Sequence, residues 1–489
     1  MLGLEEQIAE INREYAVVMV GGKCCILKEN CCSLTGKVSI TLLTPNDFRH
    51  FFANKMVEID TEKGKKEISV SKAWMESGNR RQYDGIIFDP AGKYLDSKKY
   101  NMFQGLPIKP IKGNCSLMLQ HILNVICSGN EQHYKYLLCW FARCIQQPGG
   151  QRPGVAIVLR GGQGVGKGKA VNPFGELFGA HYLHITSGSQ LTGRFNQHLA
   201  SGILVFSDEG VWGGDKVAEG VLKGLITEGT LFVEPKGKDC YTVDNHVNLI
   251  IASNSKWVTP AGMGERRFFV LDVSDCHMQD KVYFKALTDE LENGGQEAFM
   301  YHLLNEVDVN EVDLRSPPRT AGLFDQQLRT MRSIEKWWYQ LLCDGGFPDV
   351  VIDEHDKLVV RPGTLGEWPS WYSTEDLHFA YREYARANHD RYADDRMAFT
   401  KELIKLCPGL ASSRKTSGSN RQSGLSIPVL SECRTAFENL VKSPIEWPSL
   451  DILPDQRPRD YGLSVYDRTP SDMGARSPKS FSLGEMSTH

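Results

Sequence analysis

Hydrophobic residues in the first 130 positions form short runs that polar turns interrupt. Strands are predicted at YAVVMV, GKVSITLL and YDGIIFDP, which Gly, Lys and Asn residues separate. Residues 131–147 are apolar on nearly every side and end before Pro148, so they predict a buried helix. The pattern indicates a small α+β domain over residues 1–130.

After this helix, strands and helices alternate, which is typical of a parallel sheet with crossover connections. Apolar strands are predicted at GVAIVLRG, SGILVFSDEG, HVNLIIASNS and FFVLDV. Helical spacing follows the first of them, in KGKAVNPFGELFG, until Gly179 interrupts it. We therefore expect an α/β domain over residues 131–318.

A further unit is expected over residues 319–450. Its first helix, STEDLHFAYREYARAN, begins with a capping box of Ser373 and Asp376, and a second helix, RMAFTKELIKLC, follows. A turn-rich basic stretch then carries Arg414, Lys415 and Arg421 and no acid. Two helices and a basic hairpin resemble a winged helix that binds DNA, and the alternative is a helical cap with a solvated loop. Residues 451–489 are rich in Ser, Pro, Asp and Arg and predict a disordered tail.

Composition narrows the class of protein. The chain has 489 residues, 41% hydrophobic and 24% charged, which fits a soluble globular protein of roughly three domains. Its net charge of −4 requires local basic patches for any binding to nucleic acid and counts against a simple DNA-coating protein. The acidic N-terminus lacks an apolar signal core, and no segment reaches the ~20 apolar residues of a membrane span. We expect no membrane partner and a cytoplasmic location, in the host cell if a phage encodes the chain.

Four of the thirteen cysteines lie close together in the sequence CCILKENCC, at positions 24, 25, 31 and 32. Adjacent residues on a strand point to opposite faces, and zinc sites use a wider C-x2-C to C-x4-C spacing. Reduced thiols in a hairpin are therefore favoured over a metal site or a disulfide.

The stretch LRGGQGVGKGKAV, residues 159–171, contains most of a phosphate-binding loop. Gly161, Gly166 and Lys167 fit the pattern G-x-x-x-x-G-K, but Gly168 stands where Ser or Thr is usual. The loop joins a predicted strand to a predicted helix, which favours nucleotide binding over a merely flexible loop. The predicted nucleotide-binding residues are Gly161, Gly162, Gln163, Gly164, Val165, Gly166, Lys167, Gly168 and Lys169.

Polar residues follow the next two strands at positions suited to hydrolysis. Asp208 is expected to hold Mg²⁺ through its water shell, and Glu209 to polarise the attacking water. Asn254, after the following strand, can orient that water. An ordinary acidic strand end is the alternative for the two acids. Arg266 and Arg267 precede the last predicted strand. We expect them to supply an arginine finger, and the alternative is a solvated strand edge.

The loop GGQGVGKGK, the acids in VFSDE, the strand LIIASN and the segment GERRFFVLDV together resemble the AAA+ core of superfamily 3 helicases. Within that superfamily they are most similar to the primase-helicases of phages, plasmids and large DNA viruses, over roughly residues 10–310. The resemblance implies an ATP-driven hexameric ring that translocates on single-stranded DNA, and it implies that glycine is tolerated at position 168. It also implies that a hairpin carrying Lys236 and Lys238 grips the DNA backbone, and that the arginines act on the neighbouring subunit's site.

The expected function is therefore an ATP- and Mg²⁺-dependent DNA helicase that unwinds DNA during replication of a phage or mobile element. Its expected partners are single-stranded and forked DNA, further copies of itself, and a separate primase or polymerase. Residues 1–130 show no acidic constellation for a primase of their own. Two alternatives stay open: an initiator or loader that uses ATP as an assembly switch without unwinding, and another ring-shaped P-loop motor such as a packaging ATPase.

Overall fold

A computed structural model describes residues 3–31, 38–61, 64–94, 98–209, 216–236, 240–259, 261–364, 366–390, 393–417, 420–443 and 445–449. The chain divides into two compact units, Met1–Thr330 and Met331–His489. The hydrophobic pattern places this boundary at residue 318. In the structure, helix α11 (Ala321–Thr330) packs on strand β15 (Phe268–Asp272) and so lies in the first unit. The predicted tail, 451–489, lies outside the described residues.

Among its described residues, the N-terminal part of the first unit contains small sheets and three helices. Its four-stranded sheet has the order β3-β2-β1-β6. In the chain, the hairpin β4-β5 comes between β3 and β6, and the parallel pair β7-β8 follows β6. The predicted strand YAVVMV is confirmed as β1, whereas the predicted GKVSITLL and YDGIIFDP contain the shorter β3 and β7. The elements are α1 (Leu4–Glu14), β1 (Tyr15–Val20), β2 (Lys23–Cys31), β3 (Val38–Leu43), α2 (Pro45–Phe51), β4 (Met56–Thr61), β5 (Gly64–Ser69), α3 (Val70–Glu76), β6 (Gln82–Tyr83), β7 (Gly85–Ile87) and β8 (Lys99–Asn101).

The cysteine-rich segment lies on strand β2. The Cys24 side chain is exposed and that of Cys25 is half-buried, and both are free thiols. Cys32 and the side chain of Cys31 are outside the described residues. Among the described residues, no group of three or more His, Cys, Asp or Glu side chains is placed to hold a metal ion.

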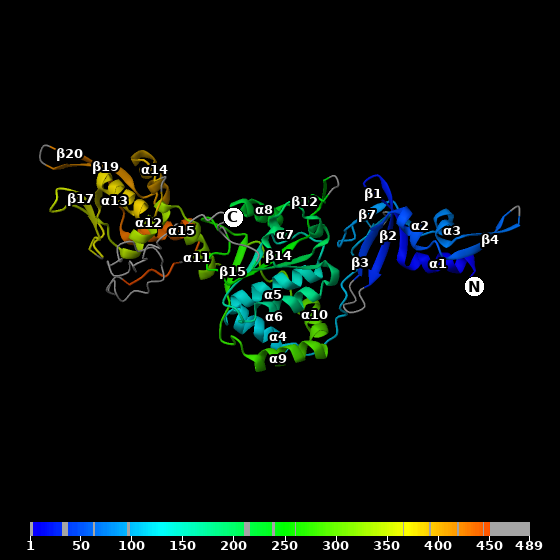
Figure 1. Ribbon diagram of the computed structural model, residues 1–489. Coiled ribbons are helices and arrows are strands. Elements are labelled where there is room, and N and C mark those ends of the chain that lie inside the picture. The colour runs from blue at the N-terminus through cyan, green and yellow to red at the C-terminus, as the bar shows by residue number, and fades with distance from the viewer. Residues whose placement is uncertain are drawn as a thin grey trace, which may run out of the picture. The chain divides into compact units, whose positions relative to one another are not determined.

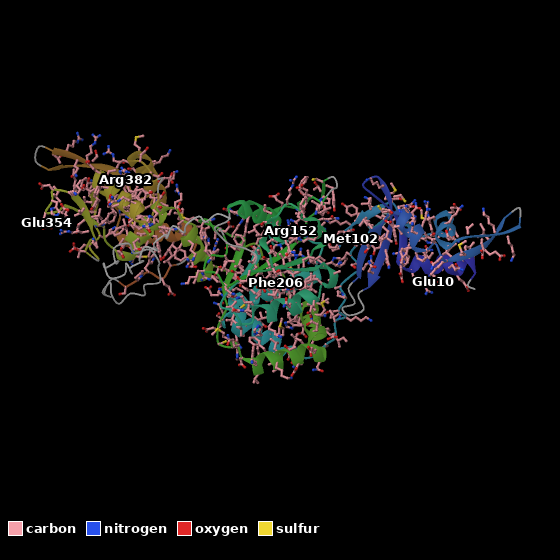
Figure 2. The ribbon with its side chains drawn as sticks, in the orientation of Figure 1. Glu10, Met102, Arg152, Phe206, Glu354 and Arg382 are labelled. Carbon is pink, nitrogen blue, oxygen red and sulfur yellow. The ribbon has the colours of Figure 1, made fainter. Side chains whose placement is uncertain are left out.

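The central sheet of the first unit is parallel and has the order β10-β11-β14-β9-β15 (Figure 1). The predicted α/β class is confirmed. The strands are β9 (Ala156–Arg160), β10 (Tyr182–Ile185), β11 (Leu204–Asp208), β14 (Asn248–Ser253) and β15. Alternate residues on each strand point to opposite faces. Phe206, labelled in Figure 2, and Ile250 therefore pack on the lower face of the sheet, and Val205 and Ile251 pack on the upper face.

Helices cover both faces of this sheet. The lower face carries α4 (Ser116–His121), the π-helix η1 (Ile122–Ile126), α5 (Glu131–Gln146), α6 (Lys167–Glu176), α9 (Lys281–Glu290), the kinked segment η4 (Leu291–Gly295) and α10 (Gln296–Asn305). The upper face carries α7 (Gly188–Thr192), the 3-10 helix η3 (Gln197–Ser201), α8 (Lys216–Thr227) and α11. The 3-10 helix η2 (Gly179–His181) precedes β10, and strands β12 (Thr230–Val233) and β13 (Tyr241–Asp244) form an antiparallel hairpin. The buried helix predicted at 131–147 is confirmed as α5.

The second unit packs three helices around an aromatic core of Trp337, Tyr381 and Phe399. Its elements are α12 (Ser333–Asp344), β16 (Asp349–Ile352), β17 (Leu358–Arg361), β18 (Trp371–Ser373), α13 (Thr374–Ala387), α14 (Arg396–Leu406), β19 (Ala411–Ser417), β20 (Asn420–Ser426) and α15 (Leu430–Val441). The Ser373 hydroxyl caps α13 by accepting from the Asp376 N–H. Strands β18, β20 and β19 form an antiparallel sheet. Across the described part of both units, no helix has the length and apolar character to span a membrane.

Candidate active site

The glycine-rich loop connects β9 directly to α6, as the sequence predicts. Gly164 and Gly166 have φ angles of 81° and 101°, in the region that favours glycine. A Cβ atom at Gly166 would also lie 2.7 Å from the His121 ring and 2.8 Å from the Phe284 ring. Both the backbone conformation and the close packing therefore require glycine there. The amide groups at the start of α6 form a site at which phosphate groups can bind.

His121 supports this loop and was not identified from the sequence. Its Nε2 atom lies 3.1 Å from the Gly166 carbonyl oxygen, and its Nδ1 atom lies 3.1 Å from the Tyr283 hydroxyl. Burial lowers the pKa of His121 to about 4, so the ring is neutral near pH 7. A neutral ring can donate to Gly166 and accept from Tyr283. A single histidine in an apolar segment gives no sequence signal for this role.

Lys167 lies inside the loop, where it is 8% exposed. Its ammonium donates to the carbonyl oxygens of Gly161 and Gly162, at 2.5 and 3.0 Å, and to the side-chain oxygen of Asn254, at 2.6 Å. Burial lowers the pKa of Lys167, while the charges of Glu209 and Asp208 oppose that shift. Lys167 does not face solvent, because the loop folds back and turns the side chain toward the end of β14.

The two acids lie at the carboxyl end of β11 and differ in their surroundings. The Glu209 carboxylate accepts from the Asn254 N–H at 2.9 Å and from the Ser253 hydroxyl at 3.2 Å. Asp208 is 40% exposed, and its carboxylate lies 3.8 Å from Nε2 of His184. Mg²⁺ in nucleotide sites is usually held by one or two carboxylates together with phosphate oxygens. Within the part of the chain that the structure describes, the Asp208 carboxylate accepts no hydrogen bond and is open to such an ion, whereas Glu209 is fixed in place beside Asn254.

Arg266 and Arg267 lie at the opposite edge of the sheet from the loop. Strands β9 and β15 are parallel, and Phe268 is paired with Ala156, so both arginines precede the amino end of the sheet. The loop follows the carboxyl end of β9, about 15 Å away at the usual rise of a strand. The arginines of one chain thus do not reach its own loop.

The two arginines also differ from each other. The Arg267 guanidinium pairs with the buried carboxylate of Glu265, at 3.1 Å. The same carboxylate accepts from the backbone N–H groups of both arginines. Arg266 is exposed, and its guanidinium has no ion-pair partner among the described residues. Arg266 is therefore the one that can reach another molecule.

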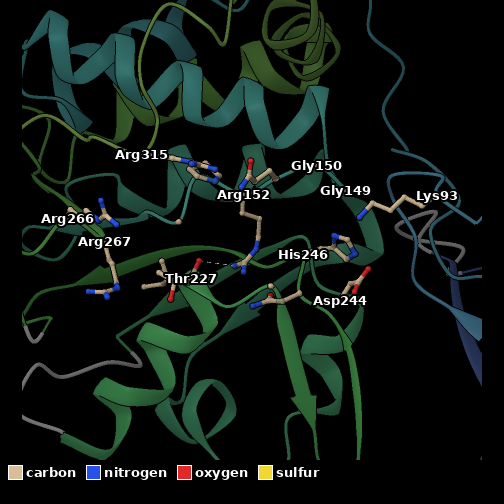
Figure 3. Close-up of a pocket in the computed structure, with 16 residues that line it drawn as sticks. Lys93, Gly149, Gly150, Arg152, Thr227, Asp244, His246, Arg266, Arg267 and Arg315 are labelled. Atoms are coloured by element: carbon tan, nitrogen blue, oxygen red, sulfur yellow. Dashed lines mark hydrogen bonds between the residues drawn. The ribbon is translucent and has the colours of Figure 1, made fainter.

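A cavity of about 830 Å³ opens beside these arginines (Figure 3). Lys93, Arg315 and Asp244 line it together with Arg266 and Arg267. Arg152 also lines the cavity, but its guanidinium already donates to the carbonyl oxygens of Leu225, Ile226 and Val247. The other cationic side chains that line the cavity outnumber its acidic residue, Asp244, so the cavity favours an anionic occupant. Lys93 and Arg315 come from separate loops and give no joint signal in the sequence.

The predicted DNA contacts lie on two hairpins. Lys236 is exposed after β12, and Lys238 lies outside the described residues. In the second unit, Thr416 of β19 is paired with Arg421 of β20, which puts Arg414 and Arg421 on one face. Lys415 lies on the other face, with its ammonium 5.0 Å from the centre of the Trp371 ring. The three cations therefore do not form one patch.

Comparisons with known proteins agree with this architecture. The profile of a family described as "Family of unknown function (DUF5906)" matches residues 159–267. The DNA primase-polymerase of Nitratiruptor phage NrS-1 is 24% identical over an alignment of 312 residues, and the match covers 61% of this chain. The chain spans only 40% of that relative's length.

Two solved structures of the NrS-1 C-terminal region, both in the apo form, share the fold. The first has a TM-score of 0.60 at 15% identity and covers 86% of this chain and 98% of that one. The second, an A form, has a TM-score of 0.58 and covers 87% and 99%. The chain is thus similar to a phage primase-polymerase in sequence and to that C-terminal region in fold.

Proposed function

We propose that the chain is an ATP-dependent DNA helicase of the AAA+ superfamily 3 type, acting in phage DNA replication. The observation that carries the proposal is the contact of Lys167 with Asn254, whose own N–H donates to Glu209. This contact joins the loop, the acidic strand and the following strand into one constellation at the carboxyl edge of the sheet. Such an edge is where α/β proteins bind their ligands.

In this proposal ATP phosphates bind the amides of residues 161–169, and Lys167 exchanges its carbonyl partners for phosphate oxygens. Asp208 holds Mg²⁺, which supplies charge neutralisation at the phosphates. Glu209, oriented by Ser253 and Asn254, accepts a proton from the attacking water.

The proposal places ATP between two copies of the chain in a hexameric ring. Arg266 lies at the edge away from its own loop, so it serves the site of a neighbour as the finger. The basic cavity beside it receives the phosphates held by that neighbour. Arg267, paired with Glu265, positions the backbone before β15.

Two hairpins are proposed to contact DNA. Beside Lys236, Phe232 on β12 is 62% exposed and Tyr241 on β13 is 41% exposed, which suits stacking with unpaired bases. In the second unit, α12, β18, α13, α14, β19 and β20 follow the order of a winged helix. The wing would be the β19-β20 hairpin, with Arg414 and Arg421 toward the backbone of forked DNA.

Strand displacement on a forked duplex, with and without ATP and Mg²⁺, tests the proposal. Helicase action requires displacement with ATP and none with the variant Lys167→Ala. ATP hydrolysis without displacement would favour the initiator or loader alternative. The absence of both would exclude an ATP-driven motor.

A further inference from the structure

The position of Gly168 leaves room beside the loop where a hydroxyl is usual. Gly168 is the second residue of α6, and a Cβ atom built on it would meet only Nδ2 of Asn172, at 3.5 Å. That distance is an ordinary van der Waals contact, so a side chain at position 168 can be accommodated. Residues four apart share a helix face, and helical side chains lean toward the N-terminus. The Asn172 amide therefore borders the place that a Ser or Thr hydroxyl would occupy.

Tyr182 fixes which end of this amide faces Gly168. The Tyr182 hydroxyl donates to Oδ1 of Asn172 at 2.8 Å. Burial raises the pKa of Tyr182 well above its usual range, and the charges of Glu176 and Asp208 add to the rise. The phenol thus stays protonated and remains a donor. With Oδ1 engaged, Nδ2 is the group left toward the loop.

The surroundings of Tyr182 connect this amide to the strand that ends in Asp208. Strand β10 runs parallel to β11, with Tyr182 opposite Leu204 and Ile185 opposite Ser207, one residue before Asp208. Helix α6 packs against both strands. Through its contact with Tyr182, Asn172 therefore lies beside β10, the neighbour of the strand that ends in Asp208.

We infer that Asn172 contacts the nucleotide from the second turn of α6, donating through Nδ2 to a phosphate oxygen in place of the hydroxyl that Gly168 lacks. This rests on the proposed function, since it requires that the loop binds ATP. An amide nitrogen donates hydrogen bonds but cannot coordinate a cation. The contact of Asn172 therefore strengthens nucleotide binding whether or not Mg²⁺ is present, and the metal depends on Asp208.

Equilibrium binding of ADP to the full chain, measured by calorimetry in Mg²⁺ and again in EDTA, tests the inference. We expect Asn172→Ala to weaken ADP binding by roughly tenfold, the usual effect of losing a hydrogen bond to a charged group, and by the same factor in both buffers. Asn172→Asp keeps the size and the acceptor for Tyr182 but replaces the donor with a negative charge, so binding should weaken further. Asn305→Ala, a substitution of an exposed asparagine at the end of α10, is the matched control and should bind like the wild type.

A second variant separates donation to phosphate from support of the fold. Gly168→Ser introduces a hydroxyl that can reach Mg²⁺, so in Asn172→Ala it should restore ADP affinity in Mg²⁺ but not in EDTA. Unchanged affinity in both Asn172 variants would overturn the inference, as would weakened binding that tracks a lower unfolding temperature. The same measurements test the proposed function separately. It fails if the wild type binds no nucleotide or if Lys167→Ala binds nucleotide as the wild type does.

Discussion

The Lys167 ammonium lies 2.6 Å from the side-chain oxygen of Asn254, although 87 residues separate the two in sequence. Asn254 also donates its backbone N–H to Glu209. The loop lysine, the amide at the end of β14 and the acid after β11 are therefore linked before any ligand arrives. Substitution of one member should disturb the others, which makes paired variants informative.

Lys167→Ala should reduce ATP hydrolysis to background, because the phosphates lose their principal cation. Since Lys167 is buried, the variant also loses packing and hydrogen bonds, so its unfolding temperature should be measured beside phosphate release. Lys167→Met keeps most of the side-chain volume and serves as the control. Hydrolysis by a folded Lys167→Met protein at the wild-type rate would refute the assignment.

Variants of Asp208 and Glu209 should lose ATP hydrolysis in different ways. Asp208→Ala should raise the Mg²⁺ concentration needed for half-maximal activity, because the exposed carboxylate is lost from the metal. Glu209→Gln should bind ATP normally and hydrolyse it slowly, since the amide oxygen still accepts from Asn254 but cannot take a proton. Nucleotide affinity and turnover, measured separately across a Mg²⁺ series, check this division. Equal loss of ATP binding in both variants would contradict it.

Much of the site could be predicted because it lies at the ends of strands with strong local patterns. Asp208, Glu209 and Asn254 follow apolar runs, and parallel pairing brings those ends together. The burial of Lys167 could not be predicted, since it depends on how the loop folds over β14. The roles of His121 and Tyr182 depend on tertiary contacts with Gly166 and Asn172.

In the two basic motifs, the accessible cations could not be predicted from the sequence. Arg266 and Arg267 look equivalent in the chain, and only the buried carboxylate of Glu265 distinguishes them. On the β19-β20 hairpin, Arg414 and Lys415 are neighbours, yet strand geometry puts them on opposite faces. In both cases, residue type predicts a basic surface, whereas partner and register determine which cation is accessible.

Stability should fall in acid because of His121. Burial lowers its pKa to about 4 from the ordinary histidine value of 6.5, so the unfolded chain binds more protons between those values. The stabilisation is complete above pH 6.5 and is lost as the pH falls toward 4, by on the order of 3 kcal/mol. Denaturant unfolding at a series of pH values measures this. His121→Gln, which does not titrate, should show a shallower decline, and an identical decline would exclude His121 as its cause.

Binding to duplex DNA should depend on one face of the β19-β20 hairpin. Arg414→Ala combined with Arg421→Ala should weaken binding and reduce the slope of log K against log salt by about 2, because two phosphate contacts are lost. Lys415→Ala should leave the slope unchanged, since Lys415 lies over Trp371 on the other face. Affinities from 50 to 200 mM salt would check both expectations. A larger effect from Lys415 than from the arginine pair would reverse the proposed orientation of the wing.

Hydrolysis should require an arginine from a second copy of the chain. Arg266→Ala should bind ATP normally and lose ~10³-fold or more in rate, the usual effect of removing a finger. Arg267→Ala should instead lower stability, because it leaves the Glu265 carboxylate buried without its cation.

Mixing distinguishes a shared site from a defect within one chain. Lys167→Ala retains Arg266, and Arg266→Ala retains the loop, so rings assembled from both variants contain some complete interfaces. Steady-state ATP hydrolysis should therefore reappear on mixing, with a maximum at comparable amounts of the two proteins. If subunits exchange and the mixtures stay inactive, or if dilute monomers hydrolyse ATP at the full rate, then Arg266 does not act on a neighbouring site. Its place at the amino edge, across the sheet from its own loop, is the physical reason to expect recovery.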